Sequence, residues 1–330
     1  MPNARRRLLA AIGAMPILAS LASFAQGSAT PRIGFLYFGT RRSAIDSRRY
    51  PAFIESLREL GYIEGKNAVI EARFADGKAE NIKALAAELV KLKPDVIVAT
   101  GSQTYRPLQQ ATTTIPIVIT VDADPVANGY GASMARPGGN ITGFSNSGGD
   151  IVAKYLELLK AAMPALARIG VLLNPGNAGH PPQLVHIMRA AQKIGIHVIL
   201  ASAASEQELT QEFSMLTKER ADAVMLLNDT FFVQQMRQIA ALSLQHRLSS
   251  IYSVSDYAVA GGLMSYGPDV IDNFRRAAVY VDKILKGAKA GELPFEQPTR
   301  YYLVINRKTA RALNLVMPQD LLLRADKVIE

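Results

Sequence analysis

The sequence of 330 residues contains no cysteine and no tryptophan. Without cysteine the chain can form no disulfide, no thiolate zinc or iron–sulfur site and no cysteine nucleophile. Charged residues make up only 20% of the chain and hydrophobic residues 49%, a balance that argues against disorder and allows substantial cores. A chain of this length is too long for one ordinary domain and suits two.

Sequence signatures of catalysis and of metal or cofactor binding are also missing. No Gly-x-Ser-x-Gly elbow is present, and Gly129-Tyr-Gly131 does not follow a strand as a dinucleotide fingerprint would. Gly61–Lys66 lacks the spacing and the Ser or Thr of a phosphate loop. The histidines show no HExxH spacing and no partnered carboxylate motif; they are His180, His186, His197 and His246. We therefore expect a binding protein rather than an enzyme, with no metal and no cofactor.

An excess of positive charge is present but mild. The formal net charge is +9, from 37 basic and 28 acidic residues. Arg5, Arg6 and Arg7 lie in a segment that we expect to be removed, which leaves 34 basic residues and a balance of +6. The remaining basic runs are no longer than two residues, as at Arg41–Arg42 and Arg48–Arg49. Nothing in this distribution predicts a nucleic-acid partner.

Residues 1–25 have the features of a signal peptide. Arg5–Arg7 supplies a positive n-region, Leu8–Leu21 an apolar h-region, and Ser23-Phe24-Ala25 the small residues that a signal peptidase reads. The h-region is too short to span the ~30 Å hydrocarbon core of a bilayer. The arginine run also resembles a twin-arginine signal, so the export route stays open. We expect the mature protein to be exported, most simply to a bacterial periplasm.

A β-α-β-α-β pattern occurs twice in the chain. The apolar strand predicted at Arg32–Phe38 recurs at Arg168–Asn174 with the same Arg-Ile-Gly start, and each copy ends in a buried-looking strand. The later elements of the pattern are predicted at 51–60, 67–74, 82–92 and 95–100 in the first copy, and at 183–194, 197–201, 209–216 and 222–227 in the second. This alternation predicts parallel sheets covered by helices on both faces, and therefore two lobes.

The segments outside the repeat predict how the lobes are completed. Strands at Ile115–Val121 and Ser249–Val254 extend the two sheets, and the amphipathic helix Asn273–Leu285 packs back on the first lobe. Two short segments rich in Gly, Ser and Asn, Thr142–Asn146 and Tyr252–Asp256, are interpreted as hinge strands. The tail, with a strand at 301–305 and a helix at 308–313, closes on the second lobe.

Candidate ligand-binding residues follow the predicted strands. In open parallel sheets, ligands bind just beyond the carboxyl ends of the strands. The candidates that follow strands of the first copy are Tyr37, Phe38, Gly39, Ser102, Gln103, Thr104 and Asp122. Those later in the chain are Asn174, Asn228, Thr230, Tyr252, Ser253 and Tyr257.

These residue types predict binding of a small zwitterion or carboxylate. A helix opening after Gly101 presents free N–H groups, which together with the Ser102 or Thr104 hydroxyl can hold a carboxylate. Asp122 or Asp229 can take an ammonium group. The same hydroxyls are also explained as ordinary helix caps, and Asn174 as part of a turn, so the individual contacts stay open.

Aromatic candidates could flank an apolar part of the ligand. The rings of Tyr37, Phe38 and Tyr257 are placed for that role by the predicted strand ends. Closure of the lobes over a ligand requires contacts from both sides. We expect Ser102 and Gln103 to anchor the ligand from the first lobe. Asn228 and Ser253 are expected to anchor it from the second.

Five segments of the sequence resemble one protein family. They are Leu60–Asn67, Ala111–Val118, Ala135–Gly143, Ala260–Gly267 and Tyr280–Gly287. The family is the ABC transporter substrate-binding proteins of the tryptophan/tyrosine-binding (TrpX-like) type, a branch of the type I periplasmic binding proteins. The resemblance covers the chain from Pro31 to Glu330.

This resemblance implies an α/β fold of two Rossmann-like lobes with parallel sheets joined by a three-crossover hinge. We place the first lobe at 31–141 plus 256–296 and the second at 142–255 plus 297–330. The resemblance further implies a small ligand, such as an aromatic amino acid or related small carboxylate, an ABC permease in the inner membrane as partner, and a monomer. The alternatives are a ligand-sensing module that docks on a membrane receptor or sensor kinase, and an exported enzyme.

Overall fold

Two β-sheets organise the protein in this computed structural model, which describes residues 30–146, 148–177 and 179–330. The predicted signal peptide, residues 1–25, lies outside the described residues. Pro31–Glu330 form one unit that contains both sheets. No helix in the described part of the chain is long and apolar enough to cross a membrane.

The first sheet has six strands, all parallel, in the order β11-β5-β4-β3-β1-β2. Apolar β-formers run through its central strands, as expected for a parallel sheet buried on both faces. Its strands are β1 (Arg32–Tyr37), β2 (Val69–Phe74), β3 (Val96–Thr100), β4 (Ile117–Asp122), β5 (Ile141–Ser145) and β11 (Phe295–Glu296).

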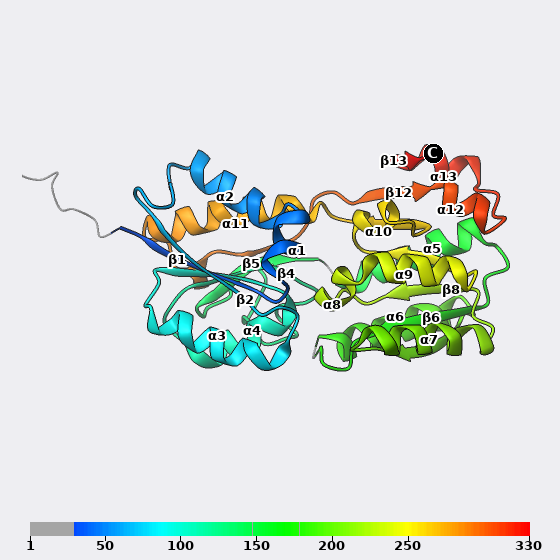
Figure 1. Cartoon of the computed structure of the whole chain (residues 1–330), viewed down its shortest axis with the longest axis horizontal. Helices are drawn as coiled ribbons and strands as arrows, with labels where there is room; N and C mark the ends of the chain where they lie inside the picture. The colour runs from blue at the N-terminus through cyan, green and yellow to red at the C-terminus, as the bar shows by residue number, and fades with distance from the viewer. Residues whose placement is uncertain (1–29, 147, 178) are drawn as a thin grey trace, which may run out of the picture. The chain divides into compact units, whose positions relative to one another are not determined.

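Helices cover both faces of the first sheet (Figure 1). Successive side chains of a strand point to opposite faces, so Phe35 of β1 packs in the core beneath α2 and α11, while Leu36 packs in the core beneath α3 and α4. The helices of this lobe are α1 (Arg41–Asp46), α2 (Arg49–Glu59), α3 (Ala79–Lys91), α4 (Ser102–Ala111), α11 (Val270–Leu285) and the 3₁₀ turn η1 (Ala290–Glu292). The predicted return of the 273–285 helix to the first lobe is confirmed.

The second sheet has seven strands in the order β13-β12-β10-β9-β8-β6-β7. Among its described pairings, β10 with β12 is antiparallel and the others are parallel. Its strands are β6 (Arg168–Leu173), β7 (His197–Ser202), β8 (Ala223–Leu226), β9 (Ser249–Tyr252), β10 (Met264–Gly267), β12 (Tyr302–Asn306) and β13 (Lys327–Ile329).

The helices of the second lobe repeat the layered arrangement. Val171 of β6 faces the core under α5 and α6, and its neighbour Leu172 faces the core under α7 and α9. The helices are α5 (Gly148–Ala162), α6 (His180–Lys193), α7 (Glu206–Lys218), α8 (Thr230–Gln234), α9 (Met236–Gln245), α10 (Ser255–Val259), α12 (Arg307–Ala312) and α13 (Gln319–Leu323).

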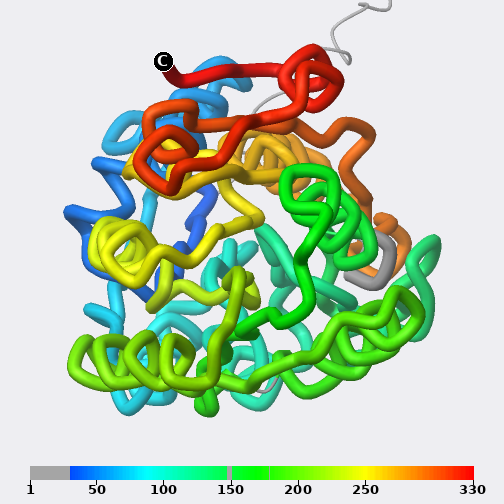
Figure 2. Tube along the Cα trace, turned by 90° about the vertical axis from the view of Figure 1, so that its right-hand side faces the viewer, coloured from blue at the N-terminus to red at the C-terminus, as the bar shows by residue number. Residues whose placement is uncertain are grey.

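Strand pairing confirms the duplicated unit. β1 lies between β2 and β3 with Arg32 opposite Val69, and β6 lies between β7 and β8 with Arg168 opposite His197. The predicted extensions by the strands near 115–121 and 249–254 correspond to β4 and β9. The C-terminal strand β12 pairs with β10, and Figure 2 shows this late segment running beside the yellow part of the tube.

The described chain passes between the sheets three times, and two passages come later than the predicted boundaries. β5 (Ile141–Ser145) belongs to the first sheet, where Phe144 packs against Tyr280 with ring centroids 5.1 Å apart. β10 (Met264–Gly267) belongs to the second sheet, so the segment 256–267 joins the second lobe rather than the first. The segments interpreted as hinge strands are therefore sheet strands and their ends. Their Gly, Ser and Asn content suggested hinge strands between the lobes, whereas β5 and β9 are paired within the sheets.

Candidate functional site

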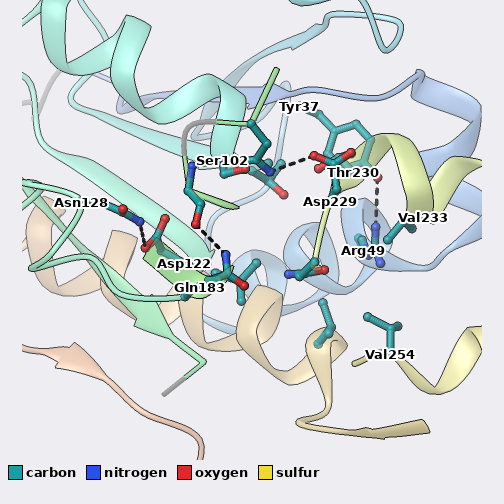
Figure 3. Close-up of a pocket in the computed structure, with 18 of the residues that line it drawn as sticks. Tyr37, Arg49, Ser102, Asp122, Asn128, Gln183, Asp229, Thr230, Val233 and Val254 are labelled. Carbon is teal, nitrogen blue, oxygen red and sulfur yellow. Dashed lines mark hydrogen bonds between the residues drawn. The ribbon is translucent and has the colours of Figure 1, made fainter. Parts of the chain in front are cut away.

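A cavity lies where the carboxyl ends of strands from the two sheets face one another (Figure 3). Its volume is about 60 Å³, and both lobes contribute to its lining. Five of the predicted residues line it: Tyr37, Ser102, Asp122, Asn228 and Thr230. The strand-end argument therefore located the cavity, because parallel strands bring their carboxyl ends to one edge of each sheet.

Asp229 is the centre of the polar network beside this cavity. Its carboxylate accepts hydrogen bonds from Gln103 Nε2 (2.7 Å), Asn177 Nδ2 (2.8 Å) and Asn174 Nδ2 (3.2 Å). It also caps α8 by accepting from the backbone N–H of Phe231 at 2.8 Å. With 3% of its surface exposed, this carboxylate is desolvated, and its donors replace the lost water.

The bond between Gln103 and Asp229 joins the two lobes. Gln103 belongs to α4 of the first lobe, and Asp229 precedes α8 of the second. The predicted residues Gln103 and Asn174 thus lie beside the cavity and hold Asp229 rather than line the cavity themselves. Because the bond can exist only with the lobes together, it stabilises the closed arrangement seen here.

His180 supports the second-lobe side of the network. Its Nδ1 accepts a hydrogen bond from the Asn174 backbone N–H at 2.9 Å, and its Nε2 lies 3.2 Å from the Asn228 carbonyl oxygen. Burial lowers the pKa of the ring. A neutral imidazole with the proton on Nε2 satisfies both contacts. From the sequence, His180 was interpreted as a residue of a loop or a helix surface, but only 1% of it is exposed.

Asp122, at the end of β4, is the acidic group of the first lobe. Its Oδ1 accepts hydrogen bonds from Asn128 Nδ2 at 2.7 Å and from the Asp124 backbone N–H at 2.9 Å. Only 4% of the residue is exposed, and this burial raises the pKa of the carboxyl to about 6. Asp122 lines the cavity, so a cationic ligand group near it would favour the ionised form.

The opening of α4 presents free backbone donors to the same cavity. The helix of ten residues begins after Gly101, which has φ +94° and provides no side-chain cap. The first N–H groups of a helix have no partner within it. The Thr104 hydroxyl donates to the Gly101 carbonyl at 2.8 Å and is fully buried. The Thr104 hydroxyl therefore stabilises the turn at Gly101. At this helix start, Ser102 is the polar side chain that lines the cavity.

Three glycines of the first lobe allow α8 of the second lobe to approach. A Cβ on Gly101 would lie 2.8 Å from Thr230 Oγ1, and one on Gly39 would lie 2.7 Å from Gln234 Nε2. A Cβ on Gly77 would lie 2.9 Å from Gln234 Oε1. The predicted ligand residue Gly39 thus lies at a contact between lobes, where a side chain would meet both Tyr37 Cε1 of its own lobe, at 2.5 Å, and Gln234 of α8.

Several predicted ligand residues do not line the cavity: Phe38, Thr104, Tyr252, Ser253 and Tyr257. Phe38 is buried in the core under α3 and α4. The rings of Tyr252 and Tyr257 stack on each other at 4.4 Å, and Tyr252 hydrogen-bonds to Ser243. All three rings are packed in a core of their own lobe instead of facing the cavity.

Residues that were not predicted from the sequence complete the lining, among them Arg49, Asn128 and Gln183. Asp229, which the sequence suggested as a partner for an ammonium group, also lines the cavity, together with Asn177. Asp229 and Asn177 lie in loops that the strand-end argument had already selected. Arg49 carried a usable signal: it shares one helical face with Ala52, Phe53, Ser56 and Leu57, all buried, so a helical period begun one turn earlier would have placed it inside.

The structure offers no metal site in the residues it describes. No group of three or more His, Cys, Asp or Glu side chains is gathered there as a metal ion would require. The chemistry available at the cavity consists of two buried carboxylates, one buried guanidinium, amide groups and the open end of α4. This arrangement can bind a small polar molecule from both sides.

Two layered α/β lobes, three chain passages and a cavity between facing strand ends define a type I periplasmic binding protein. A family described as ABC transporter substrate binding protein matches residues 44–329, and the chain belongs to this family. The resemblance and the fold class inferred from the sequence are confirmed.

Relatives of known structure or description agree with this assignment. The tyrosine-binding protein of Clostridioides difficile (strain R20291) is 27% identical over 263 residues, which are 80% of this chain and 75% of that protein. A conserved domain protein of Vibrio cholerae is 27% identical with a TM-score of 0.84, covering 91% of this chain and 100% of the other. An ABC domain from Streptococcus pneumoniae in complex with L-Trp is 24% identical with the same TM-score and coverage.

Proposed function

We propose that this protein is the substrate-binding component of an ABC importer and captures a small amino acid or related carboxylate between its lobes. The observation that carries the proposal is the cavity at the facing strand ends, because its polar lining comes from both lobes. A ligand can drive closure only if it binds the closed arrangement better than the open one. A shared site meets this condition.

The first lobe supplies complementary groups for the head of an amino acid. The free N–H groups at the start of α4 and the Ser102 hydroxyl suit a carboxylate. Asp122 on the neighbouring strand suits an ammonium group. Asn228 and Thr230 add contacts from the second lobe. A tyrosine-binding relative and one solved with L-Trp support an amino acid as the ligand class.

The partner and the location follow from the family as proposals. The loaded protein would deliver its ligand to an ABC permease in the inner membrane, and it would act as a monomer in the periplasm after removal of residues 1–25. Co-purification with a candidate ABC permease from the same organism, dependent on ligand, would test the partnership. Detection of a mature chain starting at Gln26 would test the export signal.

The absence of tryptophan allows a direct test of ligand binding. Indole emission from the purified protein after gel filtration would have to come from bound tryptophan, since the chain contains none. A thermal-shift screen with amino acids, their amides and small carboxylates extends the search, because a ligand at 100 times its Kd adds ~2.7 kcal/mol of stability. If no compound of these classes raised the Tm, the proposed ligand class would be wrong.

Alanine variants test the assigned contacts. Ser102→Ala and Asn228→Ala should each weaken binding of the ligand found in the screen by ~1–3 kcal/mol if buried hydrogen bonds are lost. Ser255→Ala removes a hydroxyl from an exposed position at the start of α10 and should leave the affinity unchanged. Equal affinities for all three variants in titration calorimetry would remove these residues from the site.

A further inference from the structure

Arg49 is a buried cation that the amino-acid head described above does not use. It opens α2, lines the cavity and is only 6% exposed. Its helix face is otherwise built of Ala52, Phe53, Ser56 and Leu57. Arginine is almost never buried without a partner, so its position in the lining calls for an explanation.

The partners present in the structure do not neutralise this guanidinium. Arg49 Nη1 donates one hydrogen bond to the Tyr37 hydroxyl at 3.2 Å, and Nε is buried with no hydrogen bond. No carboxylate of the described residues lies within ion-pair distance of it. An arginine side chain stays protonated, and the Asp256 carboxylate acts on this charge without forming an ion pair with it. The guanidinium therefore has no direct anionic partner, and an anion that paired with it would offset the cost of its burial.

The strand order separates Arg49 from the head-binding groups. Asp122 ends β4, the start of α4 follows β3, and Tyr37 ends β1, and these three strands are neighbours in the order β4-β3-β1. Adjacent strands lie ~4.8 Å apart, so Tyr37 stands ~10 Å from Asp122 along this edge. Figure 3 shows Asp122 with Asn128 on one side of the pocket and Arg49 below Tyr37 on the other.

The ammonium and carboxylate of an amino acid are attached to the same carbon, so one head group cannot span that distance. Asp122 and the start of α4 lie on adjacent strands and suit the head, and Arg49 lies one strand further on. The carboxylate of Asp229 cannot compensate Arg49 instead, because it is held by Gln103, Asn174 and Asn177.

We propose that Arg49, positioned by Tyr37, binds a second acidic group at the far end of the ligand. The ligand would then be an amino acid with an acidic side chain rather than a neutral aromatic one. This inference rests on the proposed function, since it assumes that the cavity binds the amino-acid head. A guanidinium binds a carboxylate through two parallel hydrogen bonds. Tyr37 engages Nη1 of Arg49, and Arg49 lines the cavity, so a ligand carboxylate would meet the guanidinium from the cavity side.

Titration calorimetry with defined probes tests the inference. The probes are L-glutamate and L-2-aminoadipate, which carry a side-chain acid; L-glutamine and L-phenylalanine, which do not; and glutarate and adipate, which lack the amino group. The wild type should bind the amino diacids at least ~10-fold more tightly than the neutral amino acids, and Arg49→Met should weaken only the diacids, by roughly 10- to 100-fold.

Two further variants serve as controls. Arg58→Met removes the same charge from an exposed position of the same helix and should change no affinity. Arg49→Lys keeps the charge but loses the two-pronged geometry, and it should recover part of the diacid affinity if Arg49→Met folds poorly. Circular dichroism and the Tm of each variant establish that it is folded.

The outcomes separate the inference from the proposed function. Neutral amino acids that bind as tightly as the diacids, with no selective loss in Arg49→Met, would overturn the inference and leave the proposed function standing. Dicarboxylates without an amino group that bind as well as the amino diacids, in an Arg49-dependent manner, would support the role of Arg49 and overturn the amino-acid head. No binding of any probe would overturn both.

Discussion

The two lobes are copies of one β-α-β-α-β unit, yet their equivalent strand ends carry opposite chemistry. In the first lobe, β3 ends just before Gly101, and α4 starts without a side-chain cap. In the second lobe, β8 is followed by Asp229, which caps α8 and gathers the amides of Asn174 and Asn177. The first lobe therefore keeps backbone N–H donors at the start of α4 free for a ligand, whereas the Asp229 carboxylate of the second lobe is already hydrogen-bonded.

Because of this difference, the two lobes present different groups at the cavity. The first lobe offers Asp122, the start of α4 and Arg49, groups that a ligand can pair with. The second lobe offers a network fixed internally by Asp229, which reaches across to Gln103. A pre-ordered surface loses less entropy on closing. Under the proposed function, the second lobe would serve as a rigid cover, and the first lobe would determine most of the ligand selectivity.

Replacing Asp229 should have the largest effect, because it breaks the rigid lobe itself. Asp229→Ala leaves the buried amides of Asn174 and Asn177 without an acceptor and uncaps α8, and we expect a loss of ~3–5 kcal/mol in the free energy of unfolding. Chemical denaturation measures it. Asp269→Ala, which removes an exposed cap of α11, should cost only ~1 kcal/mol. Equal losses would show that the Asp229 network adds nothing.

The pH dependence of stability should identify Asp122 in the other lobe. Its pKa in the folded protein is about 6, above the ordinary value of 3.8, so the folded state holds this proton more tightly than the unfolded state. The stability contributed is present below pH ~4 and lost as the pH rises through ~6, about 3 kcal/mol at most. Denaturation of the wild type and Asp122→Asn between pH ~4 and ~7 compares the two slopes.

A steeper fall in stability for the wild type than for Asp122→Asn over that pH range is the expected result. Parallel curves would mean that Asp122 does not titrate there. Because an ammonium group pairs with the ionised form, the affinity for an amino acid should rise over the same pH range in the wild type and stay flat in Asp122→Asn.

A side chain at Gly101 should disturb the closing of the lobes. Gly101→Ala places a Cβ 2.8 Å from Phe38 Cβ and from Thr230 Oγ1 at φ +94°, with an expected loss of ~2 kcal/mol in stability. Gly61 has the same φ, and a Cβ there would meet nothing within 4 Å. Gly61→Ala should therefore lose only the stability that the unfavourable backbone angle costs, without any steric contribution. Small-angle scattering should show Gly101→Ala, but not Gly61→Ala, more open with ligand present.

The smallest effect is expected for the bond between the lobes. Gln103→Ala removes the donor to Asp229 and should weaken ligand binding by ~1 kcal/mol, about fivefold, because the closed arrangement loses one hydrogen bond. Gln110→Ala on an exposed position of α4 is the matched control. If both variants bound ligand like the wild type in calorimetry, the contact between Gln103 and Asp229 would be incidental to closure.

Much of the fold could be predicted from local pattern. The repeat, the helices on both sheet faces and the return of α11 to the first lobe follow from apolar periodicity and strand composition. The passages between lobes could not be placed as well. Strands 141–145 and 264–267 are short and rich in Gly and Ser, and only their pairing partners, β4 and β9, determine which sheet they join.

The candidate site was predictable as a region but only partly as residues. Strand ends placed Tyr37, Ser102 and Asp122 at the cavity. They did not reveal that Tyr252 and Tyr257 would stack in a core. Whether a strand-end side chain turns inward or toward the ligand depends on the volume left by its neighbours.

The amino-acid sequence by itself determined the duplicated α/β architecture, because hydrophobic periodicity is a local property that each segment carries. Only the tertiary structure decided which polar groups meet. Arg49 and Tyr37 are neighbours through the packing of α2 on β1, and Gln103 and Asp229 through the contact of two lobes. Such contacts join residues far apart along the chain, so their geometry depends on how whole elements pack.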